Sequence, residues 1–190
     1  MKISFTLILA LFLINCSRDV NNSSSENPII TTVGYFKGKI EGTEKTVKNI
    51  GNTHYVEWTK QKDSYDRIYY GVSVMGYYQG FDLHFRVFAD NIELNKEYTM
   101  VYTNEWSKVN VDFDYSETCG APTCSSYWGC SNDFYGVPTG KVIFTAFDGK
   151  KMSGKVEAKV NHQYYGMTSN QTRIITEGVF ENAEKSFNSL

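Results

Sequence analysis

The stretch that decides the fold is RIYYGVSVMGYY at residues 67–78, followed by QG at 79–80 and FDLHFRVFA at 81–89. Apolar side chains occupy every second position from Ile68 to Val74, and again from Phe81 to Val87. Such alternation is typical of strands with one buried face, and Gln-Gly between two alternating runs predicts a hairpin turn. The solvent-facing positions of the second strand hold Asp82, His84 and Arg86.

The same alternation continues along most of the chain. It predicts further strands at residues 33–40, 45–48, 54–59, 98–102, 109–115, 142–146, 152–160 and 174–180. The Asp148-Gly149 pair predicts a tight turn, and no segment repeats apolar residues at helical spacing. About nine or ten strands with short turns predict an all-β fold. We expect an antiparallel β-sandwich, because strand lengths are uneven and one long connection interrupts them; a lipocalin-like β-barrel is the alternative.

Composition limits the class of protein. Aromatic residues make up 15% of the 190 residues, which favours strands because aromatic rings fit a pleated, half-buried surface. A formal net charge of −2 and a pI near 5.9 argue against a nucleic-acid partner, which needs a concentrated basic patch. The length suits one sizeable core, so we expect a single domain over residues 33–183 and a tail at 184–190.

The N-terminal residues have the build of an export signal. Lys2 precedes an almost unbroken apolar run that is too short to span a bilayer and closes on Leu13-Ile14-Asn15-Cys16. These four residues resemble the lipobox of bacterial lipoproteins, although Asn15 stands where Gly, Ala or Ser is usual. The resemblance implies a signal peptide over residues 1–15 and lipidation of Cys16, which anchors the chain to a membrane. An ordinary signal peptide with a chance cysteine is the alternative.

Residues 16–32 predict a flexible tether, because they are rich in Asn and Ser and have no apolar periodicity. Ser17 stands where Asp favours inner-membrane retention in many Gram-negative lipoproteins. The resemblance therefore implies an exported protein anchored in the outer membrane. Some surface-displayed lipoproteins carry an acidic cluster after the cysteine, whereas this tether has Asp19 alone in that place. Anchoring in the periplasmic leaflet and anchoring in the surface-facing leaflet are both retained as alternatives.

Both ends of the expected domain resemble one group of proteins. The segments are FKGKIEG at 36–42, GKVIF at 140–144, DGKKMSGKV at 148–156 and ITEGVF at 175–180. They are similar to segments of the small β-rich lipoproteins of unknown function in Bacteroidota. In that group, a strand like the first segment begins the domain, and a unit of strand, Asp-Gly turn, strand and Gly-X-Phe ends it. The resemblance implies no activity, and the Cys-rich middle of the chain lies outside it.

The periodicity stops in residues 117–138, where Cys119, Cys124 and Cys130 lie close together. In an oxidising compartment, this spacing predicts one disulfide that pins the loop and stabilises it by about 2–3 kcal/mol. The pairing is open, and one thiol is left over. A zinc site would need a fourth ligand from one of the His residues, and unpaired thiols or a Cys nucleophile are further alternatives.

We predict no catalytic residue, no cofactor and no metal site. The sequence lacks the common motifs of serine hydrolases, zinc proteases and phosphate-binding loops. Calcium is an alternative for four carboxylates, but a polar strand face and an Asp-Gly turn explain most of them. These residues are Asp112, Asp114, Asp133 and Asp148.

The Cys-rich loop also holds Tyr127, Trp128, Phe134 and Tyr135. Exposed aromatic rings at loop tips stack on sugars or anchor a protein partner, so these are the predicted ligand-binding residues. The alternative is that rings fill the core of a domain poor in Leu. The same two interpretations apply to aromatics near other strand ends, namely Trp58, Trp106, Tyr77, Tyr78, Tyr164 and Tyr165.

The expected function is a non-catalytic module that binds a glycan, a peptide or a protein partner outside the cytoplasm. The alternative is an enzyme, or an enzyme accessory, that acts on an extracytoplasmic polymer. A pocket with converging carboxylates of raised pKa favours the enzyme, whereas a shallow aromatic rim favours the binding module.

Overall fold

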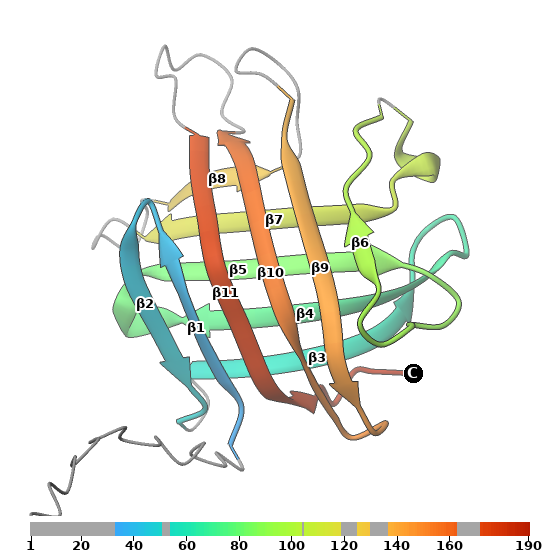
Figure 1. The fold of residues 1–190 in the computed structure, drawn as a ribbon, viewed down its shortest axis with the longest axis horizontal. Helices are drawn as coiled ribbons and strands as arrows, with labels where there is room; N and C mark the ends of the chain where they lie inside the picture. Colours follow the sequence, from blue (N-terminus) through green and yellow to red (C-terminus); the bar gives the residue numbers. More distant parts are fainter. Residues whose placement is uncertain (1–32, 51–53, 104, 119–124, 130–136, 163–171) are drawn as a thin grey trace, which may run out of the picture. The chain divides into compact units, whose positions relative to one another are not determined.

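The computed structural model describes residues 33–50, 54–103, 105–118, 125–129, 137–162 and 172–190, which form an all-β domain (Figure 1). No helix within these ranges is long and apolar enough to cross a membrane. Two single-turn 3-10 helices, η1 (Tyr77–Gln79) and η2 (Trp106–Lys108), are present. The eleven strands are β1 (Tyr35–Ile40), β2 (Thr43–Lys48), β3 (His54–Lys62), β4 (Ile68–Gly76), β5 (Phe81–Phe88), β6 (Glu97–Thr99), β7 (Val111–Thr118), β8 (Ser125–Gly129), β9 (Thr139–Phe147), β10 (Lys151–His162) and β11 (Thr172–Lys185).

The strands form two layers that cross one another (Figure 1). Layer A has the order β2-β1-β11-β10-β9-β6, and layer B has the order β3-β4-β5-β7-β8. Short ladders of two residue pairs each join the layers at two places, between β8 and β10 and, in parallel, between β3 and β11. Within the described residues, strand pairing between the layers is limited to these short ladders, and the domain is sandwich-like and not closed into a barrel. The predicted β-sandwich is confirmed.

The β4–β5 hairpin follows the sequence prediction. Every second residue of β5 is buried, beginning with Phe81, and its polar residues face outward. Gly80 closes the turn after η1 with a φ of 70°, a left-handed conformation that glycine adopts without steric cost. The hairpin therefore sets one apolar face toward the core and one polar face toward solvent.

Aromatic rings from both layers form the core. Phe36 on β1, Phe85 on β5 and Phe180 on β11 are fully buried. The ring centroids of Phe85 and Phe180, which come from opposite layers, lie 5.4 Å apart. Full burial of one such side chain stabilises a fold by about 1.5–3 kcal/mol, so these contacts hold the layers together.

β11 departs from strict alternation because it contains two bulges. Its register against β10 shifts twice, and Glu177 and Asn182 have positive φ values of 54° and 51°. A bulge inserts an extra residue and bends the strand, so the buried positions fall at uneven spacing. A third bulge lies on β9, where Ser153 of β10 pairs with Ala146 but the next residue, Gly154, pairs with Phe144, so that Thr145 is the extra residue. Ala146, which the sequence places with the buried Phe144, is consequently exposed.

Ten of the strands were predicted, and β8 is the additional one. It lies inside the predicted Cys-rich loop at residues 117–138, and β7 extends through residue 118 at the start of that loop. The segment has no apolar alternation of its own, so its strand conformation depends on pairing with β7. Conversely, the predicted strand at 98–102 is reduced to the three residues of β6.

The C-terminal residues lie along the open edge of β3. The backbone N–H of Ser186 donates to the carbonyl of Trp58, and that of Leu190 donates to the carbonyl of Lys60, each at 2.8 Å. The hydroxyl of Ser189 accepts from the N–H of Lys60, also at 2.8 Å. Residues 184 and 185, which the sequence assigns to a tail, belong to β11. These contacts close an edge that otherwise offers unpaired backbone groups to other chains.

Candidate functional site

The outer face of layer B carries rows of polar side chains that cross the sheet. The ladder places His84 of β5 opposite Ser73 of β4 and opposite Asp114 of β7. Two residues further along β5, Arg86 lies opposite Asp112. Directly opposite residues of neighbouring strands have Cβ atoms about 5 Å apart, so the hairpin and β7 bring these polar groups together.

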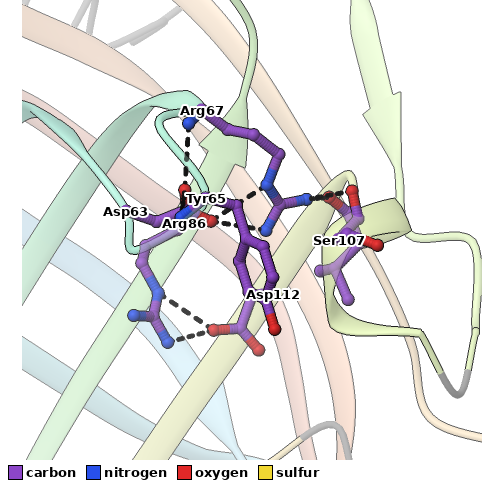
Figure 2. Close-up of polar contacts among 7 residues, drawn as sticks. Asp63, Tyr65, Arg67, Arg86, Ser107 and Asp112 are labelled. Atoms are coloured by element: carbon purple, nitrogen blue, oxygen red, sulfur yellow. Dashed lines mark hydrogen bonds and ion pairs between the residues drawn. The ribbon is translucent and has the colours of Figure 1, made fainter.

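Arg86 is held by two carboxylates. Its Nε donates to Asp112 Oδ2 at 2.9 Å, and its Nη2 donates both to Asp112 Oδ2 and, at 3.1 Å, to Asp114 Oδ2 (Figure 2 shows the pair with Asp112). The Asp112 side chain is 5% exposed, whereas that of Asp114 is 47% exposed. Asp112 therefore fixes the guanidinium in the sheet face, and Asp114 remains accessible to a ligand.

Among the carboxyl groups of this face, Asp114 has the most strongly shifted pKa. Burial, and then the nearby charge of Asp112, raise its pKa to about 6, while Arg86 opposes the shift. A carboxyl group with this pKa exchanges its proton near neutral pH and can act as donor or acceptor there.

The surroundings of His84 favour its uncharged form. Burial lowers its pKa below the usual value, the charge of Arg86 adds to the effect, and Asp82 opposes it. Its Nδ1 is hydrogen-bonded to Ser73 Oγ at 2.9 Å. A neutral imidazole and a hydroxyl group add both donor and acceptor capacity to the face without adding charge.

Beside these groups lies a cluster of rings and guanidinium groups, here called the aromatic–arginine cluster: Arg67, Arg86, Phe88 and Trp106. The Arg67 guanidinium lies 4.1 Å from the centroid of the Phe88 ring, and the Trp106 ring meets Phe88 edge-on at 6.2 Å. Arg86 lies 5.5 Å from the Trp106 ring. Phe88, which interrupts the polar alternation of β5, thus serves as the centre of this cluster.

Arg67 connects the cluster to two loops. Its Nε and Nη2 donate to Asp63 Oδ2 at 2.9 and 2.6 Å, and its Nη1 donates to the carbonyls of Ser107 and Val109, each at 2.8 Å. Figure 2 shows Arg67 extending from the β3–β4 connection to the segment that contains Ser107. These bonds hold η2, and with it Trp106, against the sheet.

Trp106 is 40% exposed and Tyr65, on the β3–β4 connection, is 56% exposed. Tyr65 lies 5.8 Å from the Arg67 guanidinium, measured to the centroid of its ring. Two partly exposed rings beside hydrogen-bonding groups form a shallow aromatic rim. Among the other predicted aromatics, Trp58 is 3% exposed and belongs to the core, where its Nε1 donates to the carbonyl of Lys150.

The outer face of layer A has a different character. Three of its lysines are paired with glutamates, in Lys37–Glu44, Lys39–Glu177 and Lys141–Glu157, at 2.7 to 3.3 Å. Two hollows lie on this layer, one of about 330 Å³ beside Lys141 and one of about 250 Å³ beside Lys37. Tyr35 is the one aromatic residue that lines either hollow. Neither hollow is lined by converging carboxylates with a raised pKa.

A separate ion pair joins the two layers. Arg173 of β11 donates from Nε and Nη2 to the two carboxylate oxygens of Glu117 on β7, at 3.0 and 3.1 Å. The hydroxyl of the buried Tyr115 donates to the same carboxylate at 2.8 Å. Glu117 therefore has charged and hydrogen-bonded partners from both layers, and we assign this cluster a structural role.

The calcium alternative has no support in the described part of the chain. Asp112 and Asp114 bind Arg86, and Asp148 Oδ1 accepts from the N–H groups of Lys150 and Lys151 in its turn. No group of three or more His, Cys, Asp or Glu residues positioned to hold a metal ion occurs within the described ranges. Asp133 lies outside them.

Several predicted site residues lie outside the described residues: Cys16, Cys119, Cys124, Cys130, Phe134 and Tyr135. Tyr127 and Trp128 belong to β8, where the register pairs Tyr127 with Ser116, and Trp128 with both Tyr115 and His162. Lipidation, the disulfide and ligand binding by these residues stay predictions.

The sequence identified Trp106 as one of several candidate aromatics and identified the polar faces of β5 and β7. It did not predict that Trp106 lies beside these faces. Arg67, Phe88 and Trp106 meet only because η2 folds back over the sheet. An aromatic residue on the polar side of β5 was the one local signal. Comparisons of the chain with protein-family models, with curated proteins and with solved structures found no match.

Proposed function

We propose that this protein is an exported lipoprotein, anchored to the outer membrane through Cys16, that binds a neutral glycan without catalysis. The proposed site is the outer face of layer B beside the aromatic–arginine cluster. The observation that carries the proposal is the position of Trp106, whose partly exposed ring stands next to Arg86, itself fixed by Asp112. The lipid anchor is supported by the N-terminal sequence, and peptide or protein partners remain the alternative ligands.

The chemistry of the face suits a sugar. The apolar face of a pyranose ring stacks on an indole, and the hydroxyl groups need donors and acceptors in fixed positions around it. Arg86 and His84 supply nitrogen donors, Asp114 supplies a carboxyl group, and Ser73 supplies a hydroxyl. All four belong to adjacent strands, so sheet hydrogen bonding holds them in place before the ligand arrives.

Charge selects against acidic glycans. The outer face of layer B and the β3–β4 connection carry five carboxylates against the two guanidinium groups of Arg67 and Arg86; the carboxylates belong to Glu57, Asp63, Asp82, Asp112 and Asp114. Arg86 is paired with two of these carboxylates, and burial lowers the pKa of His84, which favours its neutral form. A polymer of uronic acids or a sulfated chain meets like charge here, whereas a neutral sugar does not.

An enzyme is the second candidate, because two carboxyl groups on this face, Asp82 and Asp114, have raised pKa values. The pKa of Asp114 is raised to about 6 beside Asp112, which is the pattern of a general acid. Asp112, however, is buried in its pair with Arg86 and offers no free carboxylate to act as the second catalytic group. The binding module therefore remains the preferred function.

Trp106→Ala tests the site. A stacked ring contributes on the order of 1 kcal/mol beyond its buried area, so we expect binding of neutral oligosaccharides to weaken about tenfold or more. Phe187→Ala is the matched control, because Phe187 is a fully exposed ring in the C-terminal segment that lies along β3. Isothermal titration with neutral and uronic-acid oligosaccharides gives the measurement. Equal affinity of the two variants, or preference for the uronic acids, would contradict the proposed site.

Asp114→Asn separates the two functions. In a binding module the variant changes affinity and no product forms from the glycan with either protein. In an enzyme the original protein releases reducing ends from a polymer, and the variant loses that activity while it still binds.

Cys16→Ala tests the anchor. Labelling of the full chain with a fatty-acid analogue is expected to mark the original protein and to place it in the membrane fraction. Loss of both label and membrane association in the variant is the expected result. Equal labelling of the two proteins would exclude Cys16 as the lipidated residue.

A further inference from the structure

The longest strand edge that no second strand covers, among the described residues, belongs to β2. This strand pairs with β1 on one side through all six of its residues. The comparable edge of β3 is closed by the end of β11 and by the C-terminal residues, and β6 is only three residues long. An open edge presents unpaired N–H and C=O groups to any extended strand that approaches.

Three residues of β2 turn their backbone groups toward that edge. In an antiparallel ladder, alternate residues direct both N–H and C=O to the same side. The Thr46 carbonyl accepts from the Gln79 side chain rather than from β1, while the Asn49 N–H donates to Gly34, which precedes β1. Glu44, Thr46 and Lys48 therefore face outward with their backbone, and Val47 faces the core.

The sequence of β2 is complementary to itself in one antiparallel register. If two copies pair about a two-fold axis at Thr46, Glu44 of each copy lies opposite Lys48 of the other, and the two Thr46 residues face one another. Opposite charges on directly facing positions stabilise a strand pair, and facing threonines also favour it. Glu44 and Lys48 are both exposed on the outer face of layer A, so both charge pairs form at the surface, where Glu44 also keeps its partner Lys37 of β1.

We propose that two copies of this protein associate through their β2 edges, in antiparallel register about Thr46. Six backbone hydrogen bonds and two Glu44–Lys48 pairs join layer A of one copy to layer A of the other. The Gln79 side chain, which donates to the Thr46 carbonyl in the single chain, swings away and is replaced by the Thr46 N–H of the second copy.

The contact is small, and its strength depends on how the copies are held. A pair of six-residue strands buries less surface than a standard stable interface, so the association is transient in dilute solution. Chains confined to a membrane surface meet at high local concentration. The pair presents two copies of layer B, and a polymeric ligand that reaches both is retained more strongly than by one.

Cross-linking tests the register in the full chain. Residues opposite one another in such a ladder have Cα atoms about 5.5 Å apart, which is within disulfide range. Thr46→Cys is expected to give a dimer band on a non-reducing gel that exceeds the band of the unmodified chain at least fivefold. Lys155→Cys, on the same outer face but at the centre of the sheet, is the matched control. Equal bands for the two variants would overturn the proposal.

Charge reversal tests the pairing directly. Glu44→Lys places lysine opposite Lys48, and Lys48→Glu places glutamate opposite Glu44, so each variant alone is expected to associate about tenfold more weakly. Mixing the two variants, or combining both changes in one chain, restores opposite charges and is expected to restore association. Lys155→Glu is the control for altered net charge. Association of either single variant at the original strength, or no recovery in the mixture, would refute the β2 register.

Discussion

Arg86 of β5 and Asp112 of β7 form a partly buried hydrogen-bonded ion pair on the outer face of a β-sandwich, with Nε and Oδ2 2.9 Å apart. Outward positions of a sheet are usually solvated, yet only 5% of the Asp112 side chain is exposed. The Trp106 ring, 5.5 Å from the guanidinium, contributes to the enclosure of Arg86. This ion pair is held in a fixed position, and the accessible Asp114 and the exposed part of Trp106 lie beside it.

We expect Asp112→Ala to lower the free energy of unfolding by about 2–4 kcal/mol, because it leaves the Arg86 charge partly buried beside a single half-exposed carboxylate. Glu157→Ala is the matched control, since its pair with Lys141 is exposed on both sides and contributes about 0–1 kcal/mol. Urea denaturation of both variants gives the comparison. Equal losses would mean that the enclosed pair adds nothing to stability.

Asp114 predicts a pH dependence of stability. Its pKa is about 6 in the folded protein against 3.8 for an unperturbed side chain. Between these values the folded state holds a proton that the unfolded chain releases, so the contribution of this group to the free energy of unfolding falls as pH rises from about 4 to 6. Asp114→Asn should remove this slope and stabilise the protein above pH 6, by less than about 1 kcal/mol because solvent screens a half-exposed carboxylate.

The titration itself is measured from the side-chain carboxyl carbon of Asp114 by NMR. A midpoint near 4 would contradict the raised pKa. A midpoint near 6 that moves when a neutral oligosaccharide is added would place the ligand beside this group.

Gly154 of β10 has no room for a side chain. A Cβ atom there would lie 2.4 Å from the carbonyl oxygen of Ile143 and 2.5 Å from Cζ of Phe180. Gly154→Ala is therefore expected to cost about 3 kcal/mol or more, because backbone and a core ring must both shift. Gly149→Ala, in a turn with φ of 84° and open space around it, is the control and is expected to cost about 1 kcal/mol. Thermal denaturation distinguishes the two, and similar melting temperatures would show that the core adapts.

One disulfide is expected among Cys119, Cys124 and Cys130 in the exported protein. Mass spectrometry of unreduced peptides should find two of the three joined, and reduction should destabilise the protein by about 2–3 kcal/mol. Three freely alkylated thiols, or bound zinc in a one-to-one ratio, would contradict this expectation.

Local patterns predicted the strands that alternate regularly, and they failed where the pairing of distant strands sets the conformation. The β4–β5 hairpin and the Asp148-Gly149 turn were predicted correctly because both depend on residues close in sequence. β8 was missed because its residues lack alternation and its conformation depends on β7. The exposed Ala146 was placed inside because a bulge at Thr145, set by the pairing with β10, changes the phase of β9.

The candidate site likewise has a part that local sequence patterns predict and a part that depends on the tertiary structure. The sequence by itself determined an all-β domain and the outward position of Asp82, His84 and Arg86, since the period of a strand fixes which face each residue takes. Only the tertiary structure decided that Arg67 and Trp106, which are 39 positions apart, both contact the ring of Phe88. That arrangement depends on strand register and on a loop folding back across the sheet, and neither leaves a periodic trace in the amino-acid sequence.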